Sequence, residues 1–213
     1  MMMKMIKKIA PVLALMAVLA IPSERAEAQE NFFGASWMTG LPSGDMADYT
    51  ESFSWRGMSL DYRRLQTRNV SWGFSGSWQV FNDKVYTTET GSIQLGEEAV
   101  EIPGALSGTQ FRYINVFPFM ATAQYTFGMR NRTRPYLGIG AGGLYSERRT
   151  EIGTIALQST NWHFAAAPEV GLLIPLGLEA EMYVRAMYNW TSEAGGLDYT
   201  YFTFSVGVAA ISF

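Results

Sequence analysis

His163 is the only histidine of this 213-residue chain, and it is the side chain best suited to act as a general base near neutral pH. A hydrolase also needs a nucleophile, but the stretch His163-Phe164-Ala165 supplies no serine and the chain contains no cysteine. Glu169 follows six residues later, so it shares a face with His163 if the segment is a strand. A histidine and a carboxylate without a nucleophile indicate a structural role. We therefore expect no catalytic residue, no metal site and no cofactor.

The stretch YLGIGAGGLY contains glycines with the G-x-G-x-x-G spacing of dinucleotide-binding loops. In those loops the glycines begin a helix within a β-α-β unit. Here the chain continues as LYSERRT, residues 144–150, which has no helical pattern. As a strand, the stretch places Gly138, Gly140 and Gly142 on one face. We interpret this glycine row as space for bulky side chains from elsewhere, such as Tyr183 and Arg185.

Glu179 and Glu181 lie two residues apart, a spacing that directs both carboxylates to the same side of a strand. Two carboxylates could act as a general acid and a general base. Arg185 has the same parity, however, so a set of ion pairs is the better interpretation. Charges of both signs occur on the polar faces of other segments as well. The set that we expect to meet in the interior is Asp61, Arg63, Glu169, Glu179, Glu181 and Arg185.

Arg148 and Arg149 lie at the start of a predicted loop, where guanidinium groups could contact the phosphates of lipopolysaccharide. An ordinary solvated loop explains the two arginines equally well. A second predicted loop, residues 82–108, is long and acidic and could bind a partner or a cation. Its spacing of acidic residues does not match a calcium-binding loop.

The first 28 residues have the pattern of a secretory signal peptide. A basic start, MMMKMIKK, precedes the apolar run IAPVLALMAVLAI, which is too short to span a bilayer comfortably as a helix. The cleavage pattern AEA ends at Ala28, so we expect residues 1–28 to be removed and residues 29–213 to form one domain. The removed segment takes four basic and two acidic residues with it, which leaves a net charge of −5. A weakly acidic exported protein is a poor candidate for binding nucleic acid.

Eight segments of the mature chain alternate between large apolar and small or polar residues, and this period of two predicts β-strands. In NVSWGFSGSWQVF, for example, tryptophan, phenylalanine and valine alternate with serine, glycine and glutamine. The predicted strands are residues 31–40, 53–64, 69–81, 109–127, 135–147, 160–175, 177–191 and 199–213.

The connections between these strands alternate in length, because short turns (LQTR, GMRNRTR and LG) follow long loops. The long loops are residues 41–52, 82–108, 148–159 and 192–198. An even number of antiparallel strands with short turns at one end and long loops at the other is typical of outer-membrane barrels. We therefore predict an all-β fold, an eight-stranded antiparallel up-and-down transmembrane β-barrel, with apolar faces toward lipid and small or polar faces filling the lumen.

The last strand does not keep its apolar residues on one parity. Phe202 and Phe204 have even numbers, whereas Ile211 and the terminal Phe213 have odd numbers. One extra residue in a strand reverses the parity of everything that follows it. We therefore expect a β-bulge at residues 209–210 that turns both apolar sets outward.

The signal peptide, the alternating strands, the terminal aromatic residue and the stretches GASWMTGLPSGD, RPYLGIGAG and APEVGLLIPLG resemble small outer-membrane β-barrel proteins of Gram-negative bacteria. These are the barrels of the OmpX, OmpW and OmpA type, Bacteroidota-like ones especially. The resemblance covers essentially the whole mature chain. It implies a location in the bacterial outer membrane and insertion by the barrel-assembly machinery, with Phe213 as part of the signal. Lipid A deacylases of similar size use a His-x-Ser pair, and this chain has Ala165 in place of the serine.

These observations favour a structural or interaction role over an enzymatic one. We expect a monomer that contacts outer-membrane lipid and lipopolysaccharide, presents extracellular loops and has a lumen filled by side chains. The resemblance to OmpW implies an alternative, a narrow conduit or binder for small hydrophobic molecules. A lipid A-modifying enzyme is the third and least favoured alternative.

Overall fold

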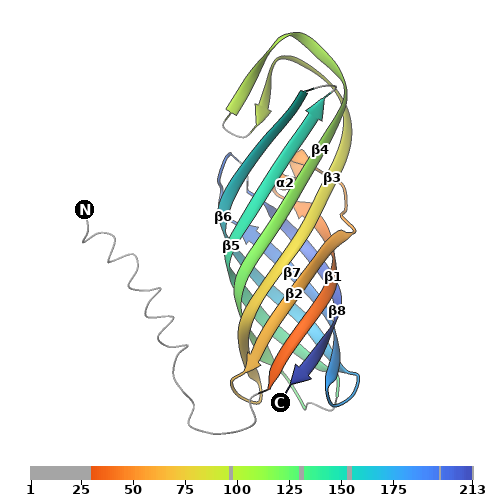
Figure 1. Ribbon diagram of the computed structural model, residues 1–213, viewed down its shortest axis with the longest axis vertical. Helices are drawn as coiled ribbons and strands as arrows, with labels where there is room; N and C mark the ends of the chain where they lie inside the picture. Colours follow the sequence, from red (N-terminus) through yellow and green to blue (C-terminus); the bar gives the residue numbers. More distant parts are fainter. Residues whose placement is uncertain (1–29, 96–97, 130–131, 153–154, 197, 213) are drawn as a thin grey trace, which may run out of the picture.

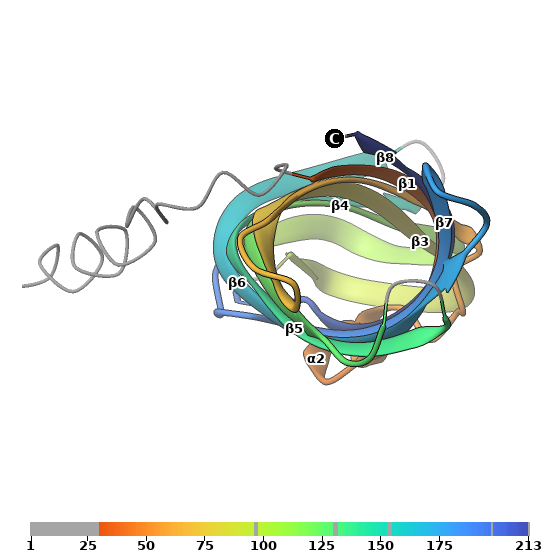
Figure 2. The same ribbon diagram turned by 90° about the horizontal axis from the view of Figure 1, so that it is seen from below.

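Eight antiparallel strands form a closed barrel, in which each strand pairs with the next and β8 pairs with β1 (Figures 1 and 2). The computed structural model describes residues 30–95, 98–129, 132–152, 155–196 and 198–212. The strands are β1 Asn31–Ser43, β2 Arg56–Leu65, β3 Val70–Leu95, β4 Glu98–Thr126, β5 Arg134–Ile152, β6 Ile155–Pro175, β7 Ala180–Thr191 and β8 Thr200–Ser212. The prediction of an eight-stranded antiparallel up-and-down β-barrel is therefore confirmed. The predicted signal peptide and Phe213 lie outside the described residues.

The outer surface of the barrel is apolar around its whole circumference, and all eight strands contribute to it. Its aromatic residues form clusters toward both ends. At the end with short turns, Tyr125 and Phe127 have ring centroids 4.8 Å apart, and at the end with long loops Trp37 stacks on Trp55. Exposed members of this surface include Phe33, Trp37, Leu60, Phe74, Trp78, Phe119, Tyr125, Leu137, Ile139, Trp162, Phe164, Val170, Val184, Trp190, Phe204, Val206 and Val208.

Strand β8 alternates without interruption, so the expected bulge at residues 209–210 is wrong. Ala209 pairs with Gly34 and Ala210 pairs with Phe33, in register with the rest of the ladder. Phe202 and Phe204 consequently face outward, while Ile211 faces inward. The inward position suits Ile211 because it belongs to an apolar cluster that fills the lumen near the short turns.

Two predicted loops are mostly strand, because β3, β4, β5 and β6 continue well beyond the ends of their neighbours (Figure 1). Residues 82–95 of β3 pair with residues 98–113 of β4, with one irregularity between Thr90 and Gly91. Residues 148–152 of β5 pair with residues 155–159 of β6 in the same way. Pairing in a hairpin satisfies backbone N–H and C=O groups that an irregular loop would leave to water.

The connection between β1 and β2 contains a short helix, α2, over Asp45–Tyr49. Its Met46 is buried in the interior, so this connection covers the lumen at the end with long loops. Within the described residues, no helix is long and apolar enough to cross a membrane.

The sequence predicts that the glycine row on β5 makes room for Tyr183 and Arg185. This prediction is wrong, because other side chains fill that space. A Cβ atom added to Gly138 would lie 2.7 Å from Glu169 Oε1, and one added to Gly140 would lie 3.0 Å from Met120 Sδ. The ring of Tyr183 instead occupies space left by glycines on β1 and β8, Gly34 and Gly207. These contacts join neighbouring or next-but-one strands and depend on their register, which parity alone does not report.

Two interior glycines mark places where neighbouring strands approach each other unusually closely. A Cβ atom added to Gly73 would lie 1.8 Å from the carbonyl oxygen of Tyr62, and one added to Gly142 would lie 2.0 Å from that of Phe119. Any larger residue would collide with backbone there. Glycine therefore permits the close approach of the neighbouring strand at these two positions.

Candidate functional site: the filled lumen

The alternation of β2, β6 and β7 directs four charged side chains into the lumen at one level. Asp61 and Arg63 come from β2, Glu169 from β6 and Arg185 from β7, and all four are buried. Three strands lie between β2 and β6 in either direction around the ring, so these strands stand on opposite walls. We call these four residues the charge layer.

The charge layer contains two arginines and two carboxylates, each within reach of both opposite charges. Arg185 Nη1 lies 2.9 Å from Asp61 Oδ1 and 3.4 Å from Glu169 Oε2. Arg63 Nη2 lies 3.3 Å from Glu169 Oε1 and 3.9 Å from Asp61 Oδ1. Full mutual pairing offsets the cost of removing four charges from water.

Polar side chains from β2, β7 and β8 complete the hydrogen bonding of the charge layer. The Tyr183 hydroxyl donates to Asp61 Oδ2 over 2.9 Å, and the Ser59 hydroxyl donates to the same oxygen over 3.0 Å. Arg185 donates to Ser59 Oγ at 2.9 Å and to Ser205 Oγ at 3.2 Å. A satisfied network of this kind is rigid, because each group holds the next in position.

Aromatic and aliphatic side chains close the lumen below the charge layer, toward the short turns. The Arg63 guanidinium lies 5.4 Å from the ring centre of Phe32 and 5.6 Å from that of Tyr136, within cation–π range. The buried apolar cluster at this level consists of Phe32, Tyr136, Leu173, Tyr183, Ala209 and Ile211.

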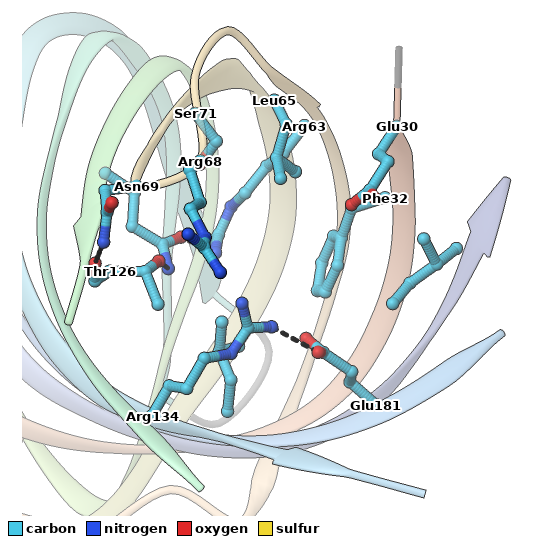
Figure 3. Close-up of a pocket in the computed structure, with 13 residues that line it drawn as sticks. Glu30, Phe32, Arg63, Leu65, Arg68, Asn69, Ser71, Thr126, Arg134 and Glu181 are labelled. Carbon is cyan, nitrogen blue, oxygen red and sulfur yellow. Dashed lines mark hydrogen bonds and ion pairs between the residues drawn. The ribbon is translucent and has the colours of Figure 1, made fainter. Parts of the chain in front are cut away.

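Of the six charged residues expected to meet in the interior, Glu179 and Glu181 lie outside the charge layer. Glu179 is exposed in the turn before β7, because the strand begins only at Ala180. Glu181 is buried one level below, where it forms an ion pair with Arg134 of β5 (Figure 3). Sequence reasoning missed Arg134, which stands at the first position of its strand.

A small pocket opens at the turn end of the lumen, next to the Arg134–Glu181 pair (Figure 3). It has a volume of about 40 Å³, enough for two or three water molecules. We call it the mouth pocket. Its lining consists of Glu30, Phe32, Arg63, Leu65, Arg68, Asn69, Ser71, Gln124, Thr126, Arg134, Leu173, Glu181 and Ile211.

A second apolar cluster closes the lumen above the charge layer, toward the long loops. Met46 of α2 enters it from the connection between β1 and β2. The other buried members come from five strands and from the residue preceding β8; they are Phe81, Ile114, Val116, Met120, Leu144, Ala165, Ala167, Tyr199 and Tyr201.

Tyr49 fixes α2 against the extended strands. Its ring centre lies 5.1 Å from the Arg112 guanidinium and 5.3 Å from that of Arg148, and its hydroxyl hydrogen-bonds with Thr150. Arg112 Nη1 also donates to the Tyr49 carbonyl oxygen over 3.0 Å. Burial raises the pKa of the Tyr49 phenol, so the hydroxyl stays neutral at physiological pH.

The structure separates the two arginines that were expected to contact lipopolysaccharide. Arg148 is buried and points inward to Tyr49, which corrects the expectation for this residue, because alternate residues of β5 face opposite sides. Arg149 is exposed on the outer face and forms an ion pair of 2.6 Å with Glu151. Neither Arg112 nor Arg148 forms an ion pair with a carboxylate in the part of the chain that the structure describes.

His163 has a serine neighbour that sequence reasoning missed. The hydroxyl of Ser146 on β5 lies 3.0 Å from His163 Nε2, while Nδ1 lies 2.8 Å from the Ser192 carbonyl oxygen. Because Nδ1–H donates to that carbonyl, Nε2 accepts from the serine. Both side chains are buried, and the Tyr199 ring packs against the histidine. Among the described residues, no group of histidine, aspartate and glutamate side chains could hold a metal ion.

No known protein family matches the chain, and no curated protein matches it. Among solved structures, Neisserial surface protein A has 11% identity and a TM-score of 0.52, over 88% of this chain and 99% of its own. OprG from Pseudomonas aeruginosa has 14% identity and a TM-score of 0.49, over 86% and 95%. Ail of Yersinia pestis, solved with the heparin analogue sucrose octasulfate, has 14% identity and a TM-score of 0.46, over 86% and 97%. At the level of fold, the expected resemblance to small outer-membrane β-barrels is confirmed.

Proposed function

We propose that this chain is an integral outer-membrane barrel with a structural and interaction role, which seals its own lumen and presents a raised wall of strands to the outside. The Arg63–Glu169 ion pair carries the proposal. It joins opposite walls of the barrel at 3.3 Å, and buried apolar clusters lie above and below it. An eight-stranded barrel has only enough interior for its own side chains, so these three levels fill it.

The outer surface supports the location in a membrane. Large apolar side chains are exposed on every strand, whereas charged side chains point inward or lie near the ends. Aromatic clusters near both ends fit the two interfaces of a bilayer. Insertion by the barrel-assembly machinery, with Phe213 as part of its signal, belongs to the same proposal, as does a monomeric state.

The extended strands support the interaction role. Residues 82–95 of β3 add a contour length of about 45 Å beyond the membrane-facing part of the strand, at roughly 3.3 Å per residue. Side chains on the outward face include exposed Lys84, Tyr86 and Arg149. Of the two arginines first considered, Arg149 remains the one that we propose to contact lipopolysaccharide phosphates.

The sealed lumen is testable in planar lipid bilayers. We expect the protein to give no steady conductance, and the double substitution Arg63→Ala/Glu169→Ala to give brief, small openings. The matched control is Arg149→Ala/Glu151→Ala, which removes the same charges from the outer face and is expected to stay silent. Steady channels from the unaltered protein would contradict the sealed-lumen proposal. A band that migrates differently without boiling, from the outer-membrane fraction, is expected alongside.

One contact favours the enzymatic alternative, namely the hydrogen bond between Ser146 and His163. A serine beside a histidine is the core of many acyl-transfer sites. Here both side chains are buried, and a backbone carbonyl rather than a carboxylate orients the imidazole. Release of fatty acid from lipid A that is abolished by Ser146→Ala would favour the enzyme. The conduit alternative requires an apolar molecule to pass four buried charges, and the charge layer opposes that passage.

A further inference from the structure

We propose that the mouth pocket binds a single carboxylate group with a short apolar substituent, such as the free C-terminus of a small peptide, entering from the side of the short turns. Arg63 of the charge layer and residues of the lower apolar cluster form the inner wall of the pocket, which opens toward the short turns. Binding at this opening does not require the lumen to open, so the proposal goes beyond the proposed function.

The charge of the mouth pocket suits one negative group. Its lining contains three arginines, Arg63, Arg68 and Arg134, and two glutamates, Glu30 and Glu181. Arg63 is already paired within the charge layer and Arg134 is paired with Glu181, so the positive group nearest the opening is Arg68. A single guanidinium suits a monoanion better than a phosphate dianion.

Three guanidinium groups of the mouth pocket have hydrogen-bonding capacity to offer. Arg134 is 7% exposed and Arg63 is 3% exposed, and the Nε atom of each is buried without a hydrogen-bond partner. Arg68 is exposed in the turn after β2, and its guanidinium points toward that of Arg134 across the pocket (Figure 3). Two guanidinium groups that face each other repel, and an anion between them replaces the repulsion with two attractions. Arginine forks match the planar geometry of a carboxylate.

The size and the apolar part of the mouth pocket limit what the carboxylate can carry. A volume of about 40 Å³ admits one small functional group and excludes a sugar ring or an aromatic side chain. Phe32, Leu173 and Ile211 line the pocket next to the arginines and belong to the same buried cluster. Such a surface favours a methyl group or a short aliphatic chain beside the carboxylate.

The proposal predicts that a carboxylate binds and its neutral analogue does not. The barrel, refolded in detergent micelles with ¹⁵N-labelled arginine, would be titrated with N-acetyl-L-alanine and with N-acetyl-L-alaninamide, while the Nε–H resonances of the arginines are followed. We expect saturable shifts of the Arg134 and Arg63 signals with the acid and none with the amide. Equal shifts with both compounds, or none with either, would overturn the proposal.

Two variants and a third probe locate the site. Arg68→Gln removes an exposed side chain, so folding should be unaffected, and we expect the acid to bind about fivefold more weakly, the equivalent of about 1 kcal/mol. The matched control is Arg132→Gln, an exposed arginine in the turn between β4 and β5 that does not line the pocket. Equal weakening in both variants would show nonspecific attraction and would contradict the site.

Inorganic phosphate that binds more tightly than the acid would contradict the carboxylate assignment. The sealed lumen is tested by conductance and the pocket by ligand titration, so either proposal can fail without the other.

Discussion

The two halves of the lumen hold positive charge in different ways. Toward the short turns, Arg63, Arg134 and Arg185 each pair with a buried carboxylate from another strand. Toward the long loops, Arg112 and Arg148 flank the ring of Tyr49, and neither forms an ion pair with a described carboxylate. In the lower half the arginines are therefore held by ion pairs between strands. In the upper half, beyond the apolar cluster, they are held by one aromatic side chain of a connecting segment.

This difference predicts that the lower half of the lumen stays closed, whereas the connection that contains α2 can detach from the upper half. A buried ion pair that loses one partner leaves the other charge uncompensated, so the lower half tolerates no partial opening. A tyrosine between two arginines is held by weaker contacts and lies near water, so α2 can leave without exposing an unpaired carboxylate. The lower half suits a seal, and the upper half suits a surface that adapts to a partner.

The largest effect expected is from Arg185→Ala, which leaves Asp61 and Glu169 to share only Arg63. We expect a loss of about 3–5 kcal/mol in the free energy of unfolding, as for other buried pairs that lose one partner. Urea unfolding in lipid vesicles, followed by tryptophan fluorescence, measures it. Arg149→Ala, which breaks an exposed pair, should cost less than about 1 kcal/mol. A similar small loss for both variants would remove the distinction between seal and surface.

Tyr183→Phe tests the hydrogen bonding of the charge layer without removing a charge. The substitution deletes the 2.9 Å hydrogen bond to Asp61 Oδ2 and keeps the ring against Gly34 and Gly207. We expect a loss of about 1.5–3 kcal/mol, the usual range for a hydrogen bond to a charged group. The same urea experiment applies. An unchanged midpoint would mean that Ser59 and Arg185 satisfy the carboxylate alone.

Tyr49→Ala tests the upper half and should have a local effect of about 1–2 kcal/mol. We expect α2 to detach, so that Glu-C protease cleaves after Glu51 on intact cells, while the urea midpoint of the barrel changes little. Tyr86→Ala, at an exposed site on β3, is the control and should leave Glu51 protected. A large drop in the urea midpoint for Tyr49→Ala would show that the upper half is as permanent as the lower half.

The smallest effect expected concerns pH in the connection between β7 and β8. Burial, together with the charge of Asp45, raises the pKa of Asp198. The unfolded connection binds this proton less readily, so the folded form gains stability as the pH falls through the raised pKa. Hydrogen-exchange protection of residues 198–200, corrected for intrinsic rates, should therefore increase on acidification. Asp198→Asn should have the higher protection already at pH 7 and lose most of the pH dependence; equal dependence in both would contradict this.

The four residues of the charge layer could be predicted to point inward from the alternation of residues along their strands. Asp61, Arg63, Glu169 and Arg185 all lie well inside regular strands, where alternation determines which way they point. Glu179 lies one residue before β7, and the end of a strand cannot be read to that accuracy from alternation.

Cross-strand contacts were harder to predict, because they depend on register. Ser146 meets His163 only through the register of β5 and β6, which follows from the geometry of the hairpin that connects them. The Arg134–Glu181 pair has the same origin. Tyr49 belongs to a connection without periodicity, and its position depends on its contacts with Arg112 and Arg148.

The sequence predicts loops where the structure has extended strands, for a related reason. Residues 82–108 are rich in threonine, glycine and glutamate and lack the apolar alternation that a lipid-facing strand requires. The alternation reports contact with lipid on one side, so it fades where the strands leave the apolar surface although the backbone pairing continues.

The close backbone approaches at Gly73 and Gly142 link the diameter of this barrel to its composition. Duplicating one hairpin would produce a ten-stranded barrel with gentler curvature and a lumen wide enough to admit water. In that wider ring the neighbouring backbone would withdraw from both positions, and alanine would become acceptable where the eight-stranded ring admits only glycine. An engineer who wishes to convert this plug into a pore can therefore use tolerance of alanine at these two positions as a readout of how far the ring has opened.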